Sequence, residues 1–171
     1  MRILICITVI IFMVSCSETN YKNSNNDLLV KTSLIKSFDS TYEAHISRKT
    51  SIIDILLINM SDKPKTFWIM TCSWQENFLI NYPVIEFEGI SCDSNFPVVK
   101  TIESRDTLKF KALVSINNRA LPIVAPRLGF LYIDTIQCKN EHEFKSFIMD
   151  RSKQEKIFWS DTINVGIRIY K

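Results

Sequence analysis

Apolar and polar residues alternate with a period of two over most of the chain after Leu28. This alternation is typical of β-strands that bury one face, because successive side chains of a strand point to opposite sides of the sheet. Residues 107–116 and 162–170 carry the clearest pattern, with an apolar side chain at every second position. We therefore expect a half-buried strand in each segment.

A hairpin is predicted in the first half of the chain. Residues 51–59 and 65–74 are apolar stretches, and the turn-forming sequence Ser-Asp-Lys-Pro at 61–64 lies between them. Weaker strand signals occur at residues 28–35, 42–47, 84–89, 97–102 and 127–136. About seven to nine short strands separated by turn signals are typical of an antiparallel β-sandwich.

One segment departs from this pattern. Asn140 can cap a helix, Glu143 completes an arrangement similar to a capping box, and apolar residues from Phe144 onward follow at helical spacing. These features predict a short helix at residues 141–152, packed on the sandwich. No sequence repeat or second domain is evident, so residues 28–171 are expected to form a single β-sandwich domain.

The first 16 residues look like a sorting signal. Arg2 supplies a positive charge, and the mostly apolar run at 3–14 is shorter than the ~20 residues that a membrane span requires. The sequence Met13-Val14-Ser15-Cys16 resembles the lipobox of bacterial lipoproteins, although that family usually has leucine at the position of Met13. The resemblance implies a signal peptide at 1–15 that is removed and a diacylglycerol group on Cys16.

Two other fates of this segment stay open. The sequence Ser15-Cys16-Ser17 also fits ordinary secretory cleavage, which would release a soluble product, and an uncleaved anchor is disfavoured by the short apolar run. If Cys16 is lipidated, its two or three acyl chains would hold the protein stably on a membrane. By resemblance to lipoprotein sorting, Ser17 favours the outer membrane. Whether the domain faces the periplasm or the cell surface stays open.

The stretch at 17–26 is polar and has nothing to bury, so residues 16–27 are expected to be the lipidated cysteine and a flexible tether. As a random coil, such a tether spans roughly 18 Å. The tether therefore keeps the domain close to the bilayer.

The charge and motif content favours binding over chemistry. The formal net charge of +3 gives no reason to expect a nucleic-acid partner. Only three glycines are present, and neither a glycine-rich phosphate loop nor the motifs G-x-S-x-G and H-E-x-x-H occur. We therefore predict no cofactor, no metal and no recognisable catalytic residue, and an enzyme is the less favoured interpretation.

Three cysteines stay in the mature domain, because Cys6 leaves with the signal peptide and Cys16 takes the lipid. An exported protein reaches an oxidising compartment, and we favour a disulfide between Cys72 and Cys92 with Cys138 unpaired. A loop of about 20 residues closed in this way contributes on the order of 3 kcal/mol. The alternative is three reduced, buried cysteines.

Trp68, Met70, Cys72 and Trp74 are expected to share one face of a strand. Such a face could stack on a carbohydrate, but a core position is favoured because tryptophan is usually mostly buried. The Cys-x-Trp pattern followed by a second cysteine resembles immunoglobulin-like domains, although the spacing differs from the antibody type. The resemblance implies an immunoglobulin-like sandwich.

A second resemblance concerns two short motifs. The sequence Cys72-Ser73-Trp74, followed by Asp93-Ser94-Asn95-Phe96-Pro97, is similar to uncharacterised lipoproteins of the Bacteroidota. That family implies no known activity.

Two sets of residues could carry chemistry. Cys138 and His142, four residues apart, could form a thiolate–imidazole pair or contribute zinc ligands, but His142 between two glutamates is more typical of a solvated helical turn. Glu86 and Glu88 lie on one strand face and could act as paired carboxylates, although exposed acids are common.

The sequence thus favours a lipid-anchored cell-envelope protein that works as a non-catalytic binding module. Its expected partners are the membrane, through Cys16, and an envelope protein or a polysaccharide. A toxin-immunity or inhibitor lipoprotein is the first alternative, and a hydrolase with an unrecognised site is the second.

Replacement of Cys16 by Ala is expected to abolish fatty-acid labelling and to release the protein from membranes, because the acyl chains are its expected attachment. Metabolic labelling and membrane fractionation measure both effects. Labelling that persists in the Cys16→Ala protein would contradict the lipidation hypothesis.

Overall fold

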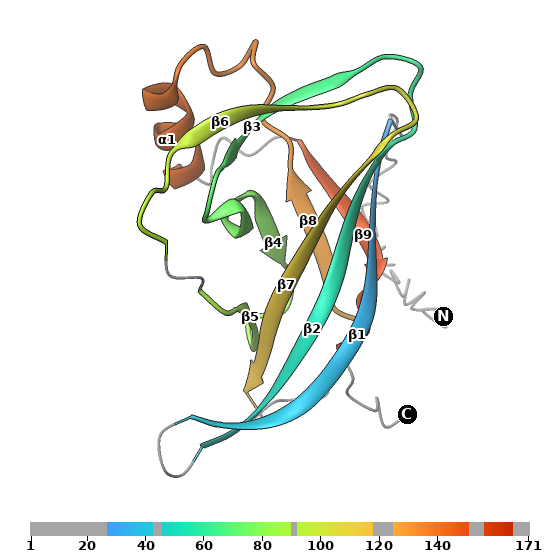
Figure 1. Ribbon diagram of the computed structural model, residues 1–171, viewed down its shortest axis with the longest axis vertical. Coiled ribbons are helices and arrows are strands. Elements are labelled where there is room, and N and C mark those ends of the chain that lie inside the picture. Colours follow the sequence, from blue (N-terminus) through green and yellow to red (C-terminus); the bar gives the residue numbers. More distant parts are fainter. Residues whose placement is uncertain (1–26, 43–45, 90–91, 118–124, 151–155, 166–171) are drawn as a thin grey trace, which may run out of the picture.

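The computed structural model describes residues 27–42, 46–89, 92–117, 125–150 and 156–165. The signal peptide, Cys16 and the tether expected from the sequence lie outside these ranges. The described chain forms antiparallel β-sheets with one short α-helix and a 3₁₀ turn (Figure 1). Its elements, in chain order, are β1 (Leu28–Tyr42), β2 (Ile46–Asn59), β3 (Lys65–Met70), η1 (Trp74–Asn77), β4 (Phe78–Ile80), β5 (Ile85–Phe87), β6 (Pro97–Ile102), β7 (Thr107–Asn117), β8 (Arg127–Leu131), α1 (Glu141–Met149) and β9 (Ile157–Thr162).

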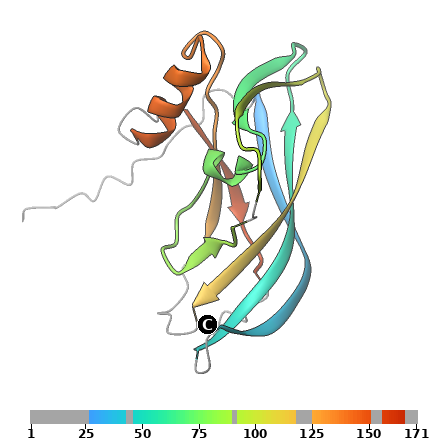
Figure 2. The same cartoon turned by 60° about the vertical axis from the view of Figure 1, so that its left-hand side comes forward.

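The strands form three sheets. Sheet A has the order β1-β2-β7-β5, sheet B pairs β3 with β6, and sheet C has the order β4-β8-β9. Figure 2 shows the long strands of sheet A as one layer, with sheet C and α1 on the other side. An isolated bridge between Phe67 and Asp134 joins sheet B to the segment after β8. The predicted antiparallel β-sandwich with one short helix is confirmed.

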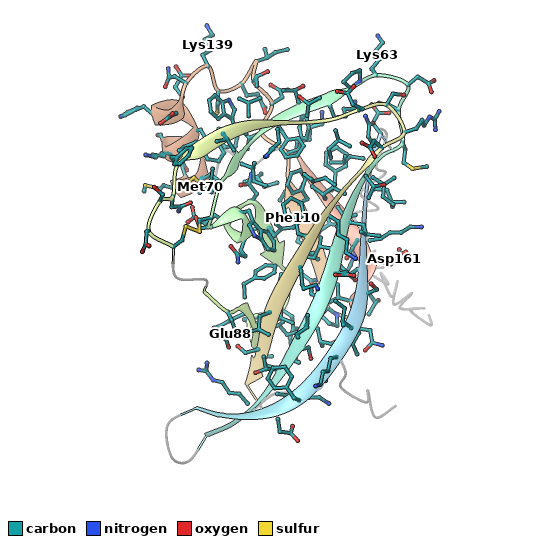
Figure 3. The ribbon with its side chains drawn as sticks, in the orientation of Figure 1. Lys63, Met70, Glu88, Phe110, Lys139 and Asp161 are labelled. Carbon is teal, nitrogen blue, oxygen red and sulfur yellow. A yellow bond between two sulfur atoms is a disulfide. The ribbon has the colours of Figure 1, made fainter. Side chains whose placement is uncertain are left out.

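Aromatic side chains from all three sheets meet in the main core. The ring centroid of Phe130 on β8 lies 5.2 Å from that of Phe67 on β3 and 5.1 Å from that of Phe78 on β4. Phe110 projects from β7 toward the same region, with its centroid 5.5 Å from that of Phe78 (Figure 3). The pairs Phe67–Phe130 and Phe78–Phe110 are edge-to-face, and Phe78–Phe130 is tilted. Aromatic pairs of this kind contribute about 0.5–1.5 kcal/mol each beyond the burial of their area. They hold the layers together.

The helix covers a second, smaller core. Phe144 is fully buried and packs with Met70, Leu131, Ile133 and Cys138. No helix in the described ranges is long and apolar enough to cross a membrane.

The predicted helix start at Asn140 is confirmed. The side-chain oxygen of Asn140 accepts a hydrogen bond from the backbone N–H of Glu143 at 3.0 Å, which is the predicted cap. The carboxylate of Glu143 accepts from the backbone N–H of Lys139 at 2.7 Å. The predicted end was too late, because the helix ends at Met149 and Asp150 caps it.

The predicted hairpin of residues 51–59 and 65–74 is wrong. Strand β2 pairs with β1 along one edge and with β7 along the other, so neither edge is open to β3, which pairs with β6. The buried side chain of Asn59 stabilises the passage between the sheets. Its amide nitrogen donates to the carbonyl oxygens of Lys63, Ile102 and Glu103 at 2.8, 3.1 and 3.0 Å. Its oxygen accepts from the backbone N–H of Ser61 at 3.0 Å.

Two predicted strands have different ends. The strand expected at 65–74 ends at Met70, because the chain turns into η1 at Trp74. The strand expected at 162–170 is wrong over the described residues 163–165, which follow the end of β9 (Ile157–Thr162); residues 166–170 lie outside the described ranges. Ile163 and Val165 are nevertheless buried, so the alternation there correctly indicated burial but not strand pairing.

The other strand predictions hold to different degrees. The predicted strand at 97–102 is confirmed with the same ends, and the one at 107–116 extends by one residue. The strand at 28–35 is the first half of the longer β1, whereas those at 84–89 and 127–136 are shorter than predicted. Within the segment at 42–47, Tyr42 ends β1 and Ile46 begins β2. Strand β4 was not predicted, and neither were residues 157–161 of β9.

Replacement of Asn59 by Ala is expected to lower the free energy of unfolding by about 2–4 kcal/mol, because it removes the side-chain partner of three backbone carbonyls, one of them in a buried hydrogen bond. Chemical denaturation measures the loss. Thr101→Ala is the matched control, because the Thr101 hydroxyl contacts Thr66 at an exposed position and its loss is expected to cost within about 0.5 kcal/mol. Equal effects of the two substitutions would contradict the role of Asn59.

Candidate functional site

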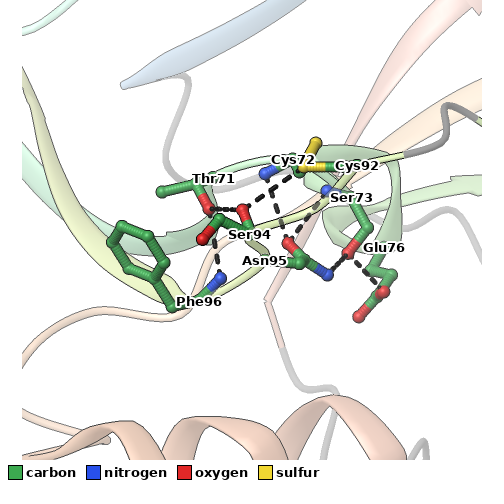
Figure 4. Close-up of a disulfide and its surroundings, with 8 residues drawn as sticks. All are labelled: Thr71, Cys72, Ser73, Glu76, Cys92, Ser94, Asn95 and Phe96. Atoms are coloured by element: carbon green, nitrogen blue, oxygen red, sulfur yellow. Dashed lines mark hydrogen bonds between the residues drawn. A yellow bond between two sulfur atoms is a disulfide. The ribbon is translucent and has the colours of Figure 1, made fainter.

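The predicted disulfide between Cys72 and Cys92 is present (Figure 4). Cys72 is half-buried and Cys92 is exposed. Asn95 reinforces the disulfide, because its side-chain oxygen accepts from the backbone N–H groups of Cys72 and Ser73 at 3.2 and 3.1 Å. The backbone N–H of Thr71 donates to the carbonyl of Phe96 at 3.0 Å and so continues the pairing of sheet B. These contacts join the end of β3 to the start of β6, which is a structural role.

The two tryptophans of the predicted stripe occupy different cores. Trp74 packs on Phe110, with ring centroids 4.8 Å apart, in the main core. Trp68 stacks on Phe144 at 5.9 Å in the smaller core and donates its ring N–H to the carbonyl of Cys138 at 2.6 Å. The expectation that they share one strand face is wrong, because β3 ends between them. Their packing supports the core interpretation over a carbohydrate platform.

The resemblance to immunoglobulin-like domains does not extend to the disulfide. In antibody-type domains the tryptophan packs on a buried bridge between the sheets. Here Cys92 is exposed, and Trp74 packs against phenylalanine rings. The bridge therefore fastens a loop rather than the centre of the sandwich.

Cys138 and His142 line one open cavity of about 260 Å³ beside α1. Cys138 is free and almost fully buried, whereas His142 is exposed. Burial raises the pKa of the Cys138 thiol, and the carboxylates of Glu143 and Asp134 raise that pKa further. A raised pKa disfavours the thiolate that a nucleophile or a metal ligand needs. In the described part of the chain, no three His, Cys, Asp or Glu residues are grouped to hold a metal.

Glu86 and Glu88 lie at the edge of sheet A. Glu86 is exposed and stands beside Ser115, while the backbone N–H of Glu88 donates to the carbonyl of Leu113 at 2.8 Å. Glu86 also borders a small cavity of about 100 Å³. Their arrangement places both acids next to β7, at the end of the sheet that is distant from the start of β1 (Figure 1).

The outer face of sheet A is the broad surface that the sequence analysis did not identify. On β2, Ile53, Ile55 and Leu57 are fully buried, so the residues between them point away from the core. The strand register places the outward residues in rows across β1, β2 and β7. Four successive rows are Lys31–Leu56–Lys109, Ser33–Asp54–Lys111, Lys36–Ile52–Leu113 and Phe38–Thr50–Ser115. In the last row Thr50 and Ser115 are buried, and only Phe38 is exposed.

Large apolar side chains gather in the last two of these rows, which contain Lys36 and Phe38. Phe38 is 39% exposed and Leu113 is 37% exposed. Ile35, the extra residue of a bulge between Leu34 and Lys36, is 48% exposed. Isolated exposed apolar residues are common on proteins, whereas a group on one face is typical of an interaction site.

The alternation of residues 107–116 contained a signal for this face. The same pattern that placed Val114 in the core placed Lys109, Lys111 and Leu113 outside it. The residues of β1 could not be added, because β1 reaches this face through β2, and β2 pairs with β7, which is distant in the sequence. The bulge near Ile35 also shifts the register in a way that periodicity does not show.

Comparisons with known proteins return no relative of this chain. No family model matches it, and neither does any curated protein or solved structure. The resemblances of residues 13–16 and 72–97 to lipoproteins therefore stay expectations from the sequence.

Peptide mapping without reduction is expected to find Cys72 joined to Cys92, and iodoacetamide is expected to modify Cys138 only after unfolding. The physical reason is that the thiol is enclosed by the smaller core and held in its neutral form. Mass spectrometry of the native and denatured protein measures both. Rapid modification of Cys138 in the folded protein would contradict its burial and revive the proposal of a reactive pair with His142.

Proposed function

We propose that this protein is a lipid-anchored component of the bacterial cell envelope and acts as a non-catalytic binding module. The signal-like sequence that ends at Cys16 supports the anchor. The group of exposed apolar side chains on the outer face of sheet A supports binding, and it is the observation on which the proposal rests. The partner is another protein of the envelope, because protein interfaces bury apolar side chains at their centre.

The position of Asp27, the first described residue, is consistent with this arrangement. Asp27 is held at the beginning of β1, where its carbonyl accepts from the N–H of Met60 at 2.8 Å and its carboxylate binds Lys65 at 2.8 Å. Phe38 lies roughly 33 Å further along the same strand. A tether that ends at Asp27 would thus leave the apolar rows at the end of the domain distant from its attachment.

We expect the partner to contact the outer face of sheet A at Phe38 and Leu113. A photoreactive amino acid placed at either position in the full chain, with the protein in its native membrane, is expected to give a discrete crosslinked product. The partner would bury these two side chains. Gel mobility and mass spectrometry of the product measure the outcome.

The matched control is the same photoreactive residue at Val99, which is 44% exposed on β6 in sheet B. A discrete product from Val99 and none from Phe38 or Leu113 would contradict the proposed surface. If Glu86→Gln and Glu88→Gln abolish the phenotype that the native protein confers on the cell but leave crosslinking unchanged, the hydrolase alternative is favoured instead.

A further inference from the structure

The first three of the four rows on the outer face of sheet A, from the row of Lys31 to that of Lys36, are basic. They contain four lysines, and Asp54 is their single acid. Asp54 is only 15% exposed and binds Lys109 at 2.6 Å, so that pair is internally neutralised. Among the described residues, none forms an ion pair with Lys31, Lys36 or Lys111. Three exposed positive charges are therefore available to a partner.

Apolar side chains lie between these charges. Leu56 stands directly between Lys31 and Lys109 in its row, and Ile52 stands next to Lys36. Rows on one face of a strand repeat every ~6.7 Å, which is also the spacing of alternate side chains in an extended peptide. An extended segment that alternates acidic and apolar residues thus matches the spacing of this face.

The charge becomes net negative at the β5 edge of the same face, where two acids outnumber Arg48, which borders the same small cavity as Glu86. Glu86 stands beside Ser115, and Glu88 is hydrogen-bonded to Leu113 through the backbone. A negatively charged ligand is attracted by the lysine rows and repelled by this edge. The opposed charges therefore confine such a ligand to β1, β2 and the first half of β7.

We propose that the partner contacts this face with an acidic segment of polypeptide, whose carboxylates pair with Lys31, Lys36 and Lys111. Its apolar side chains rest on Leu56 and Ile52. This inference rests on the proposed binding function and adds the chemistry of the ligand. Electrostatic complementarity of this kind mainly determines which partner binds and how fast it associates.

A polypeptide fits better than the other anionic surfaces of an envelope. A flat bilayer would meet the whole face, including the acidic edge at Glu86 and Glu88, which it would repel. An acidic polysaccharide offers carboxylates but few apolar groups to cover Ile52 and Leu113. A polypeptide segment is narrow enough to occupy the lysine rows alone and supplies both kinds of side chain.

The test uses the purified full chain and a fluorescent random copolymer of glutamate and tyrosine as the probe. The triple substitution Lys31→Glu, Lys36→Glu and Lys111→Glu is expected to weaken binding by about tenfold or more, because three attractions become repulsions. Fluorescence anisotropy measures the affinity, and thermal melting verifies the fold. Added salt is expected to weaken binding by the native chain.

The matched control is Lys63→Glu, Lys100→Glu and Lys145→Glu, a triple change at exposed sites outside this face. It alters the net charge equally and is expected to change the affinity less than about twofold. A loss equal to that of the first variant would show that only net charge matters, which overturns the proposal.

A variant that is expected to bind more tightly makes the test independent of any folding defect, because unfolding would not raise the affinity. Glu86→Gln with Glu88→Gln is expected to raise the affinity for the copolymer severalfold, because the repulsive edge is removed. Unchanged or weaker binding would overturn the proposal. So would tighter, lysine-dependent binding to heparin or to phosphatidylglycerol vesicles than to the copolymer.

Failure of the acidic-ligand proposal is distinguishable from failure of the proposed binding function. Crosslinking from Phe38 and Leu113 that persists in the lysine variants would leave the binding module intact and reject only the acidic ligand. Absence of crosslinking from both positions would reject the binding surface itself, whatever the copolymer does.

Discussion

The pairing of β2 along both of its edges is the constraint on which the rest of the structure depends. With β1 on one side and β7 on the other, the backbone groups of β2 are satisfied within sheet A. The alternating side chains must then divide between the core and the outer face. Because no edge is left for β3, the chain leaves the sheet at Asn59, whose buried amide satisfies the backbone of the crossing.

The same pairing creates the surface to which we assign function. Ile53 and Leu57 face the aromatic core, and the residues between them are turned outward whatever their polarity. Leu56 and Ile52 thus lie among lysines from two other strands. A rigid, twisted sheet fixes these positions without the cost of ordering a loop, which favours a preformed binding surface. The helix and the disulfide stabilise the opposite side of the sandwich.

Local sequence features predicted the local structure. The cap at Asn140 and the alternation at 107–116 act over a few residues, so their outcome needed no knowledge of distant strands. Cys72 and Cys92 could be paired because a short loop favours that bond and the signal-like first residues led us to expect an oxidising compartment. In contrast, Trp74 was misplaced, because a strand and a strand followed by a 3₁₀ turn have the same apolar pattern over so few residues.

The sequence by itself determined the β-sandwich class and the short helix after Asn140, and it favoured a bridge between Cys72 and Cys92 without excluding reduced cysteines. Only the tertiary structure decided which strands are neighbours, and therefore that Lys36, Ile52 and Leu113 form one row across three strands. The physical reason is that strand pairing is chosen by competition among distant segments for hydrogen-bonding edges and core volume. Periodicity shows which face of a strand is apolar, but not which strand lies next to it.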